Sequence, residues 1–343
     1  MKFIIHFILI LFFPWLGQAQ NDWYQKKAIH YPHVLNPIEK PGYTLVYGDE
    51  FNSKSFNHDI WEQENNSPAD SWHCYVDEPN RNGTNYDYSN GETLKLFVKK
   101  EKVIGTAYIW EADPPLIYDK EYDYSAALFI SRKLFIHGYF EIRCKLPNGR
   151  TLWPAFWLYG EDWEEIDIFE IFGSELTTIE TNYHWKGNKG IGTGCAGDNK
   201  NWCSNARSIE IDKPDFSEEF YTFGLEWSTN KLDFYLNNKK IRSIYKDCNV
   251  AKTPMRMVAG VGLSDFHGQP DPSIFPAELE IDYIRIYKKL WVEDFSYENG
   301  GYRINEHPRY IADVNGDGKK DIIAFGNEGV YVALSYENSN GPG

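Results

Sequence analysis

Short runs in which apolar and polar residues alternate extend from Tyr43 to Tyr287, separated by clusters of Gly, Asn, Pro and Asp. A period of two places successive side chains on opposite faces of a β-strand. No segment offers a convincing amphipathic helix of useful length. The pattern therefore predicts an all-β protein, either a sandwich or a barrel.

The alternation is most informative in the run Glu165-Ile-Asp-Ile-Phe-Glu170. Glu165 and Asp167 project from one face of a regular strand, whereas Glu170 falls on the other face. A β-bulge, one extra residue between Asp167 and Glu170, would return Glu170 to the acidic face, and bulges are enriched beside active sites. We therefore predict three carboxylates along one cleft.

Carboxylates crowded in this way cannot all stay ionised, so at least one pKa must rise. One protonated and one ionised carboxyl at the same pH is what glycosidic cleavage requires, and a separation of roughly 5 to 5.5 Å implies retention of configuration. The alternative is a solvated strand face. The large apolar residues that flank the acids, Ile and Phe, count against that alternative.

The same residues resemble the active-site strand of glycoside hydrolase family 16 in its bulged form, with two residues between Asp and the second Glu. Most of the chain shares the resemblance, which implies a jelly-roll β-sandwich of the concanavalin A-like type around a long sugar-binding cleft. The matching stretches are Tyr43–Phe51 with Trp61, His137–Pro147, Leu152–Leu158, Glu165–Glu170, Phe223–Trp227, Leu232–Leu236 and Phe275–Tyr287.

The resemblance implies a role for each residue of the cleft. Glu165 matches the nucleophile, Glu170 the acid/base, and Asp167 the residue that orients and tunes the nucleophile. Trp153 matches a Trp that stacks on sugar. His184, in Asn182-Tyr-His-Trp185, matches a His that reaches the same cleft, although a lone His is more often structural.

Other residues match the family less closely. Trp72 and Arg81 are candidate substrate contacts in a poorly matched loop. Asp282 resembles a family residue that binds a structural Ca²⁺ on the face away from the cleft, and the alternative is a solvent-facing Asp. Three stretches are expected as loops that could border the cleft: Trp72–Tyr88, Trp110–Tyr124 and Tyr183–Trp202.

The amino terminus has one Lys, an apolar run from Phe3 to Leu16, and small residues at Gly17 and Ala19. This is the pattern of a secretory signal peptide over residues 1–19, and it predicts export to the extracellular space or periplasm. A membrane anchor is the alternative, but the run is shorter than the ~20 residues that a span needs. The catalytic domain is expected over 20–290.

The formal net charge of −15 argues against nucleic acid as a partner held by bulk electrostatics. It leaves a sulfated polysaccharide open, since a local Arg or Lys could bind each sulfate. Disulfides can persist in an exported chain, and Cys195 and Cys203 are the best candidate pair among the five cysteines. Cys144, in an apolar strand, is expected as a small core residue.

The segment 291–343 follows a different pattern. Asp313, Asn315, Asp317 and Asp321 place oxygen ligands at positions 1, 3, 5 and 9 of a Gly-rich loop, with Ala324 where an EF-hand has Glu. The loop and the apolar strands after it resemble one FG-GAP/VCBS-type calcium-binding repeat, the unit of a β-propeller blade. We therefore expect a structural Ca²⁺ here.

One repeat alone is too little, because repeat units bury their faces against neighbours. The segment is therefore a truncated array, a remnant docked on the catalytic domain, or an edge that seeks another protein.

Taken together, the residues and the resemblance predict a secreted, retaining endo-glycosidase that hydrolyses a β-linked polysaccharide without an organic cofactor. A β-1,3-glucan of laminarin type is favoured over an algal galactan, the substrate of agarases, porphyranases and carrageenases. A transglycosylase could use the same residues. Two hypotheses from different classes are a non-catalytic sugar-binding jelly roll and a calcium-dependent adhesion protein. All three carboxylates remain, which counts against the former, and the single repeat counts against the latter.

Overall fold

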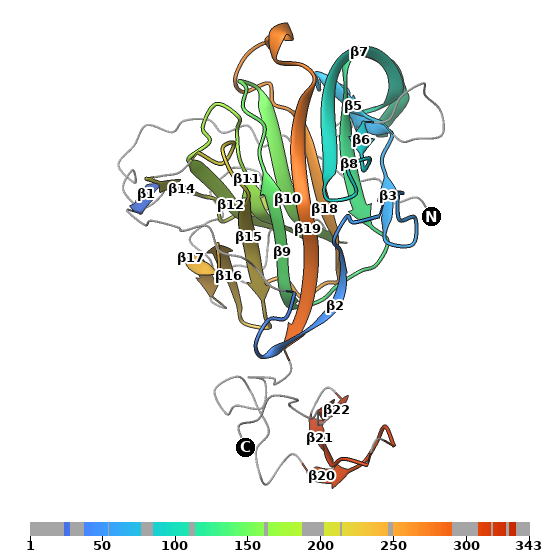
Figure 1. Cartoon of the computed structure of the whole chain (residues 1–343), viewed down its shortest axis with the longest axis vertical. Helices are drawn as coiled ribbons and strands as arrows, with labels where there is room; N and C mark the ends of the chain where they lie inside the picture. Colours follow the sequence, from blue (N-terminus) through green and yellow to red (C-terminus); the bar gives the residue numbers. More distant parts are fainter. Residues whose placement is uncertain are drawn as a thin grey trace. The chain divides into compact units, whose positions relative to one another are not determined.

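The computed structural model describes residues 24–27, 38–53, 55–76, 85–109, 114–160, 164–186, 202–212, 215–245, 250–289, 308–316, 318–326 and 329–333. The chain divides into two compact units, one of residues 1–36 and 47–286 and the other of residues 37–46 and 287–343. Nearly all regular structure in the described residues is β (Figure 1), apart from 3-10 turns such as η4 (Pro272–Ile274). Within those residues, no helix is long and apolar enough to cross a membrane.

The first sheet of the larger unit contains the acidic run. Its strands pair in the order β3 (Trp61–Gln63), β8 (Leu116–Ser131), β18 (Met255–Leu263), β10 (Leu152–Gly160), β11 (Glu165–Glu170), β12 (Thr178–Lys186), β14 (Arg207–Ile211) and β1 (Tyr24–Lys27). The short strand β13 (Trp202–Ser204) pairs with the end of β12. Each of these pairs is antiparallel except β1 with β14.

The second sheet lines up β6 (Tyr86–Asp87), β7 (Leu94–Ile109), β19 (Ala277–Lys289), β9 (Gly138–Lys145), β15 (Tyr221–Trp227), β16 (Lys231–Leu236) and β17 (Lys239–Tyr245). The remaining strands of the chain's first hundred residues are β2 (Tyr43–Asp49), β4 (Asn66–Pro68) and β5 (His73–Tyr75). Strands β4 and β5 run parallel to β7 and β8, which join the two sheets as a long hairpin.

The two sheets pack face to face through large apolar side chains. Phe169 of β11 meets Phe223 of β15 with ring centroids 4.4 Å apart, and both side chains are buried. Alternation along each strand turns the other side chains away from this core. The predicted all-β sandwich is therefore confirmed, and it places the acidic residues of β11 on the outward face of the first sheet.

One predicted loop is wrong. Of the stretch Trp110–Tyr124, residues from Leu116 onward belong to β8, and Tyr118, Tyr122 and Tyr124 pair with residues of β7. The run Tyr118-Asp-Lys-Glu-Tyr-Asp-Tyr124 already alternates with a period of two, so its polar composition concealed a strand. The stretch Trp72–Tyr88 likewise contains β5 and β6, and the stretch Tyr183–Trp202 begins in β12; their residues 77–84 and 187–201 lie outside the described residues.

The cysteines agree in part with the expectation. Cys144 is fully buried in the main core, as predicted. Cys74 is likewise a buried thiol, and its Sγ donates a hydrogen bond to the carbonyl of Tyr75. Cys203 forms a disulfide. Cys195, its predicted partner, lies outside the described residues.

The smaller unit contains a three-stranded antiparallel sheet of β20 (Arg309–Ala312), β21 (Asp321–Gly326) and β22 (Gly329–Ala333). The loop with the predicted calcium ligands connects β20 to β21. Gly316 and Gly318 have φ angles of 78° and 82°, a conformation that favours glycine, so the two glycines permit the tight course of this loop.

Candidate active site

A β-bulge in β11 brings the three carboxylates onto one face. Asp167 pairs with Asn182 of β12 and Glu170 pairs with Glu180, so three residue steps on β11 match two steps on β12. The pairing with β10 skips Ile168, which is the extra residue. The bulge predicted from the parity of the sequence is therefore confirmed.

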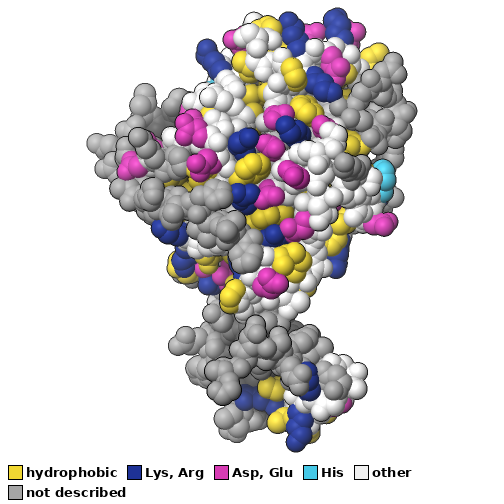
Figure 2. Space-filling view, in the orientation of Figure 1, with side chains coloured by type: hydrophobic (Ala, Val, Ile, Leu, Met, Phe, Trp, Pro, Cys, Tyr) yellow, Lys and Arg dark blue, Asp and Glu magenta, His cyan; other side chains and the backbone are white. Residues whose placement is uncertain are grey.

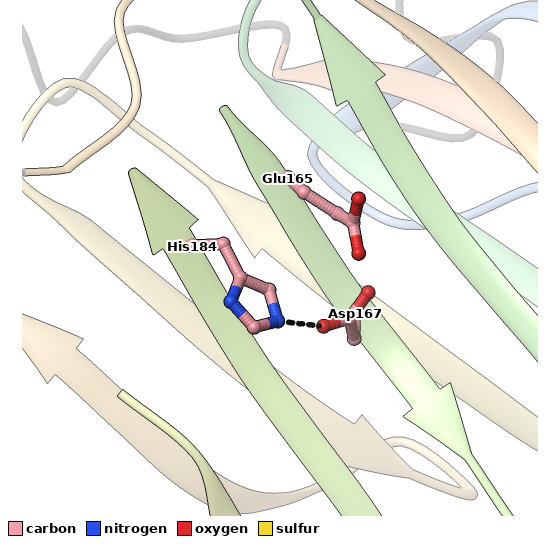
Figure 3. A group of neighbouring side chains, drawn as sticks. All are labelled: Glu165, Asp167 and His184. Carbon is pink, nitrogen blue, oxygen red and sulfur yellow. Dashed lines mark ion pairs between the residues drawn. The ribbon is translucent and has the colours of Figure 1, made fainter. Parts of the chain in front are cut away.

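The neighbouring strand β12 supplies a histidine to the same face. His184 pairs with Glu165 across the strands, and its Nε2 lies 3.2 Å from Oδ2 of Asp167 (Figure 3). The side-chain amide nitrogen of Asn182 lies 2.8 Å from the same Nε2. His184 and Asp167 are 5% and 3% exposed, so their contact is shielded from solvent. The structure thus joins His184 to the predicted catalytic group and gives Asp167 a fixed orientation beside Glu165.

Burial and mutual repulsion hold protons on this group. Burial raises the pKa of Glu165 well above its usual value, and the charges of Asp167 and Glu170 raise it further. Burial likewise raises the pKa of Glu170, together with the charges of Asp167 and Glu180, while the indole of Trp153 acts in the opposite direction. A carboxyl whose pKa is raised in this way can keep its proton at a pH where an ordinary carboxyl is ionised, which is what a general acid requires.

Glu165, Asp167 and His184 also form a group that could hold a metal ion, because their ligand atoms lie within 4.8 Å of one another. Two carboxylates and one imidazole suit a first-row transition ion better than Ca²⁺, which prefers an all-oxygen set. None of the three belongs to the predicted calcium ligands. In the structure Nε2 of His184 lies 3.2 Å from Oδ2 of Asp167, so the candidate ligands lie directly beside one another.

An aromatic cluster borders the acid/base candidate. Trp153 of β10 is half-buried, and its ring centroid lies 5.6 Å from that of Phe172 and 6.4 Å from that of Phe266. His267 extends the cluster, 4.4 Å from Phe172. Phe266 is 45% exposed, as expected for a ring that can meet the apolar C–H face of a sugar. The indole of Trp153 also acts on Glu170, and its predicted role of stacking on sugar stays a prediction.

Several residues of this face were not predicted from the sequence. Trp157 pairs with Asp167 and Tyr159 pairs with Glu165, so both aromatic side chains point to the same side as the acids. Their signal was available, because Trp157 and Tyr159 follow Trp153 at even spacing. Phe266 and His267, in the loop after β18, carried no such signal, since only the folded chain brings that loop to Trp153.

The weaker predictions have different outcomes. Trp72 is half-buried against the main core, so its described contacts are those of packing. Arg81 lies outside the described residues. Asp282, on β19 of the second sheet, forms an ion pair with Arg143 of β9 and is 32% exposed. Their roles in binding substrate or calcium stay predictions.

The predicted calcium loop is closed by its own backbone. Oδ1 of Asp313 accepts a hydrogen bond from the N–H of Gly316 (2.7 Å), and Oδ2 accepts one from Gly318 (2.8 Å). Asp321 is buried and also accepts a backbone N–H. Of the four predicted ligands, the structure describes Asp313, Asn315 and Asp321, and Asp317 lies outside the described residues.

A sandwich sheet that holds a protonatable carboxyl, an ionisable partner on the same strand and an aromatic platform defines a carboxylate-dependent glycoside hydrolase. The chain belongs to glycosyl hydrolases family 16, whose sequence profile matches residues 77–285. This is a retaining family of polysaccharide-cleaving enzymes.

Known proteins resemble a large part of the chain. A glucan endo-1,3-beta-glucosidase of Cryptopygus antarcticus is 32% identical over 209 residues, which are 57% of this chain and 67% of that protein. A beta-glucanase of Acetivibrio thermocellus is 27% identical over 59% of this chain. The matched region spans only 57% of the length of that beta-glucanase. The laminarinase catalytic domain of Thermotoga maritima MSB8 superimposes with a TM-score of 0.57 at 26% identity, covering 72% of this chain and 98% of that one.

Proposed function

We propose that the protein is a secreted, endo-acting β-1,3-glucanase of laminarin type that works by double displacement. The observation that carries the proposal is the bulged strand β11, which places Glu165, Asp167 and Glu170 on one face, where burial and neighbouring carboxylates raise the pKa of Glu165 and of Glu170. The substrate follows from the relatives, which include an endo-1,3-beta-glucosidase and a laminarinase.

In the first step Glu165 attacks the anomeric carbon while Glu170 donates its proton to the departing glycosidic oxygen. The new ester bond at Glu165 removes the negative charge that Glu165 had presented to its neighbours. Repulsion on Glu170 then weakens, so its pKa falls just when it must act as a base. In the second step Glu170 takes a proton from water, the water oxygen bonds to the anomeric carbon, and the ester bond to Glu165 breaks.

Other residues orient the nucleophile and bind the sugar chain during these two steps. Asp167 orients the carboxyl of Glu165 toward the sugar; His184 lies against Asp167, and Asn182 contacts the ring of His184. Trp153 and the exposed ring of Phe266 offer flat apolar surface to the chain on one side of Glu170. Trp72 and Arg81 are proposed as further substrate contacts from the stretch Trp72–Tyr88.

The test is the release of reducing ends from laminarin, lichenan, agarose, porphyran and κ-carrageenan by the purified mature protein, beside a Glu165→Gln variant. We expect release from laminarin that the variant abolishes. Cleavage of a galactan instead would contradict the proposed substrate but would agree with the proposed mechanism. Binding to any of the polymers without cleavage would overturn the proposal in favour of a sugar-binding module.

We also propose that the carboxyl-terminal sheet is an FG-GAP/VCBS-type repeat that binds structural Ca²⁺ through Asp313, Asn315, Asp317 and Asp321. A Gly-rich loop of oxygen-bearing side chains supports this proposal. Calorimetric titration of the full chain with Ca²⁺ should lose one binding event in Asp313→Ala. Loss of an event in Asp282→Asn would instead locate a site on β19.

A further inference from the structure

Beyond the three carboxylates of β11, a fourth acidic side chain lies on the same face. Glu180 of β12 pairs directly with Glu170 and, on its other side, with Ser208 of β14. Ala155 of β10 pairs with Glu170 in turn, so Ala155, Glu170, Glu180 and Ser208 form one row across four strands. Side chains directly opposite each other on neighbouring strands have Cβ atoms about 4.5 to 5.5 Å apart. Glu180 therefore borders the acid/base.

One carboxylate oxygen of Glu180 is held and the other is open to a ligand. Ser208 Oγ donates a hydrogen bond of 2.7 Å to Oε2 of Glu180. Oε1 has no hydrogen bond to any residue that the structure describes, and the side chain is partly exposed. A serine that fixes one oxygen presents the other as a preorganised acceptor, which is a suitable partner for a sugar hydroxyl.

The negative charge of Glu180 is not neutralised by an ion pair within the described part of the chain. Burial raises the pKa of Glu180, while the hydrogen bond from Ser208 and the charge of Arg242 act in the opposite direction. The guanidinium of Arg242 is itself hydrogen-bonded to Thr181 (2.7 Å) and Asn205 (2.8 Å). Glu175 adds a further negative charge to the surroundings of Glu180. An anionic group placed beside Glu170 would therefore meet repulsion.

A basic residue on the same face is also unavailable to a substrate anion. Arg256 of β18 pairs with Tyr159, so it projects to the side of the acids. Its guanidinium forms an ion pair with Glu62 of β3. The row beside Glu170 thus combines an acceptor for hydroxyl groups with an uncompensated negative charge.

We propose that Glu180 is a specificity-determining residue: it accepts a hydrogen bond from a sugar hydroxyl beside Glu170 and excludes sugars that carry a sulfate or carboxylate there. The inference rests on the proposed cleavage of a polysaccharide and goes further by restricting the substrate class to neutral chains. A sulfate ester is negatively charged, so Glu180 repels it. It also lacks the O–H donor of a free hydroxyl, so it cannot form the hydrogen bond to Glu180.

The test compares kcat/KM on two matched pairs of polymers, laminarin with partially sulfated laminarin and agarose with porphyran. Each enzyme is assayed at its own pH optimum, because removal of the Glu180 charge also affects Glu170. In Glu180→Gln the rate on the sulfated member, relative to the neutral one, should rise about tenfold at low salt, the effect of one carboxylate a few ångströms from a sulfate. The rate on the neutral polymer should change only a few-fold, since the amide oxygen still accepts a hydrogen bond.

Two controls separate charge from structure. Glu278→Gln, on the second sheet, should leave the ratio unchanged. A second control uses the unaltered protein. Raising the salt from about 0.02 M to about 0.5 M should lower its ratio of kcat/KM on the neutral polymer to kcat/KM on the sulfated one, because salt screens the repulsion. An unchanged ratio in a folded Glu180→Gln, or discrimination that is insensitive to salt, would overturn the inference.

Failure of the proposed function has a different signature. If the protein cleaves neither neutral polymer, the β-1,3-glucanase proposal fails, but affinity electrophoresis in gels containing each of the four polymers still tests Glu180. Binding of the neutral members and exclusion of the sulfated ones, relieved in Glu180→Gln, would support the inference alone. Equal retardation by both members of each pair would contradict it.

Discussion

Two strands of this protein share one sequence pattern and differ in its use. Strand β11 reads Glu-Ile-Asp-Ile-Phe-Glu, and strand β19 contains Glu-Leu-Glu-Ile-Asp. Both turn apolar residues inward and acidic residues outward. Of the two, β11 has the bulge, which brings its three acids onto one face.

The neighbouring strands make the difference. On the second sheet every acid of β19 has a basic partner from β7 or β9, and Figure 2 shows side chains of both signs interspersed over the face that it displays. The pairs are Glu278 with Lys95, Glu280 with Lys145 and Asp282 with Arg143. On β10 and β12 the corresponding neighbours of the β11 acids are Ala155, Trp157, Tyr159, Glu180, Asn182 and His184.

The pKa values move in opposite directions as a result. Burial would raise the pKa of Glu280, but hydrogen bonds from Lys145 and Thr93 outweigh burial and lower it. Burial and neighbouring carboxylates instead raise the pKa of Glu165 and Glu170. A pattern of alternating acids thus identifies an exposed face, and cross-strand partners decide whether that face is inert or reactive.

The largest expected effect comes from removing the nucleophile. Glu165→Gln should lower kcat on laminarin by at least about a thousandfold, because an amide cannot form the glycosyl ester. The matched change Glu280→Gln, in the same sequence context on β19, should alter kcat less than about twofold, as expected for a surface site. Comparable losses in both variants would show that the acids act through folding rather than chemistry.

Removal of the acid/base should cost somewhat less. Glu170→Gln is expected to lower kcat on laminarin by about a hundred- to ten-thousandfold, the usual contribution of a general acid. An activated aryl glycoside needs little protonation, so its glycosylation step should survive, and added azide should accelerate turnover by replacing water. The product in Glu170→Gln should be the β-glycosyl azide, because azide attacks the glycosyl-enzyme; an α-glycosyl azide from this variant would show that the two roles are exchanged.

The pH profile should reflect the raised carboxyl pKa values. Activity should fall as the pH rises through the raised pKa of Glu170, since only the protonated form donates. In Glu180→Gln one repelling charge is gone, so this falling limb of kcat/KM should move to lower pH by about one unit or less. Glu278→Gln should leave the limb in place. A shift toward higher pH would contradict the electrostatic account.

Stability should respond with opposite sign on the two strands. The folded pKa of Glu165 is raised, so the folded protein binds more protons than the unfolded chain, and stability falls as the pH rises from the ordinary carboxyl range through the raised value. At neutral pH Glu165→Gln removes that loss and should raise the melting temperature by about 2 to 4 °C per kcal/mol recovered.

Glu280 behaves in the opposite way. Its folded pKa is lowered, so its contribution is present at neutral pH and disappears as the pH falls through the folded value. Glu280→Gln should therefore lower stability at neutral pH, by less than about 1 kcal/mol because the pair with Lys145 is partly solvated. Thermal unfolding of both variants at several pH values tests whether Glu165→Gln raises stability and Glu280→Gln lowers it at neutral pH.

Local regularities were sufficient to predict much of the fold and the core of the site. Period-two alternation predicts the strands, and the parity of Glu165, Asp167 and Glu170 alone implies the bulge that the structure contains. Alternation within Thr178–His184 also carries a readable signal for Glu180, since it has the same parity as His184. The alternation of side chains along a single strand depends only on residues that are neighbours in the sequence, so it can be predicted from the sequence.

Partners from distant strands could not be predicted in this way. Arg143 and Asp282 are 139 residues apart, and nothing local indicates that β9 and β19 lie side by side. The position of Phe266 beside Trp153 depends on the pairing of β10 with β18. The difference between β11 and β19 therefore lies in their tertiary contacts, which the alternating pattern does not show. The family resemblance, rather than the pattern, identified β11 as the candidate catalytic strand.

Glu165 is expected to be the nucleophile of a strand whose acids are used for covalent chemistry. A 2-deoxy-2-fluoro laminaribiosyl donor with a good leaving group slows both steps, the second more, so the glycosyl-enzyme accumulates. Mass spectrometry of the digested protein should find one equivalent of sugar on the peptide that contains Glu165, and none in Glu165→Gln. A label on Glu170 or Glu180, or no label on an enzyme that turns over laminarin, would contradict the account.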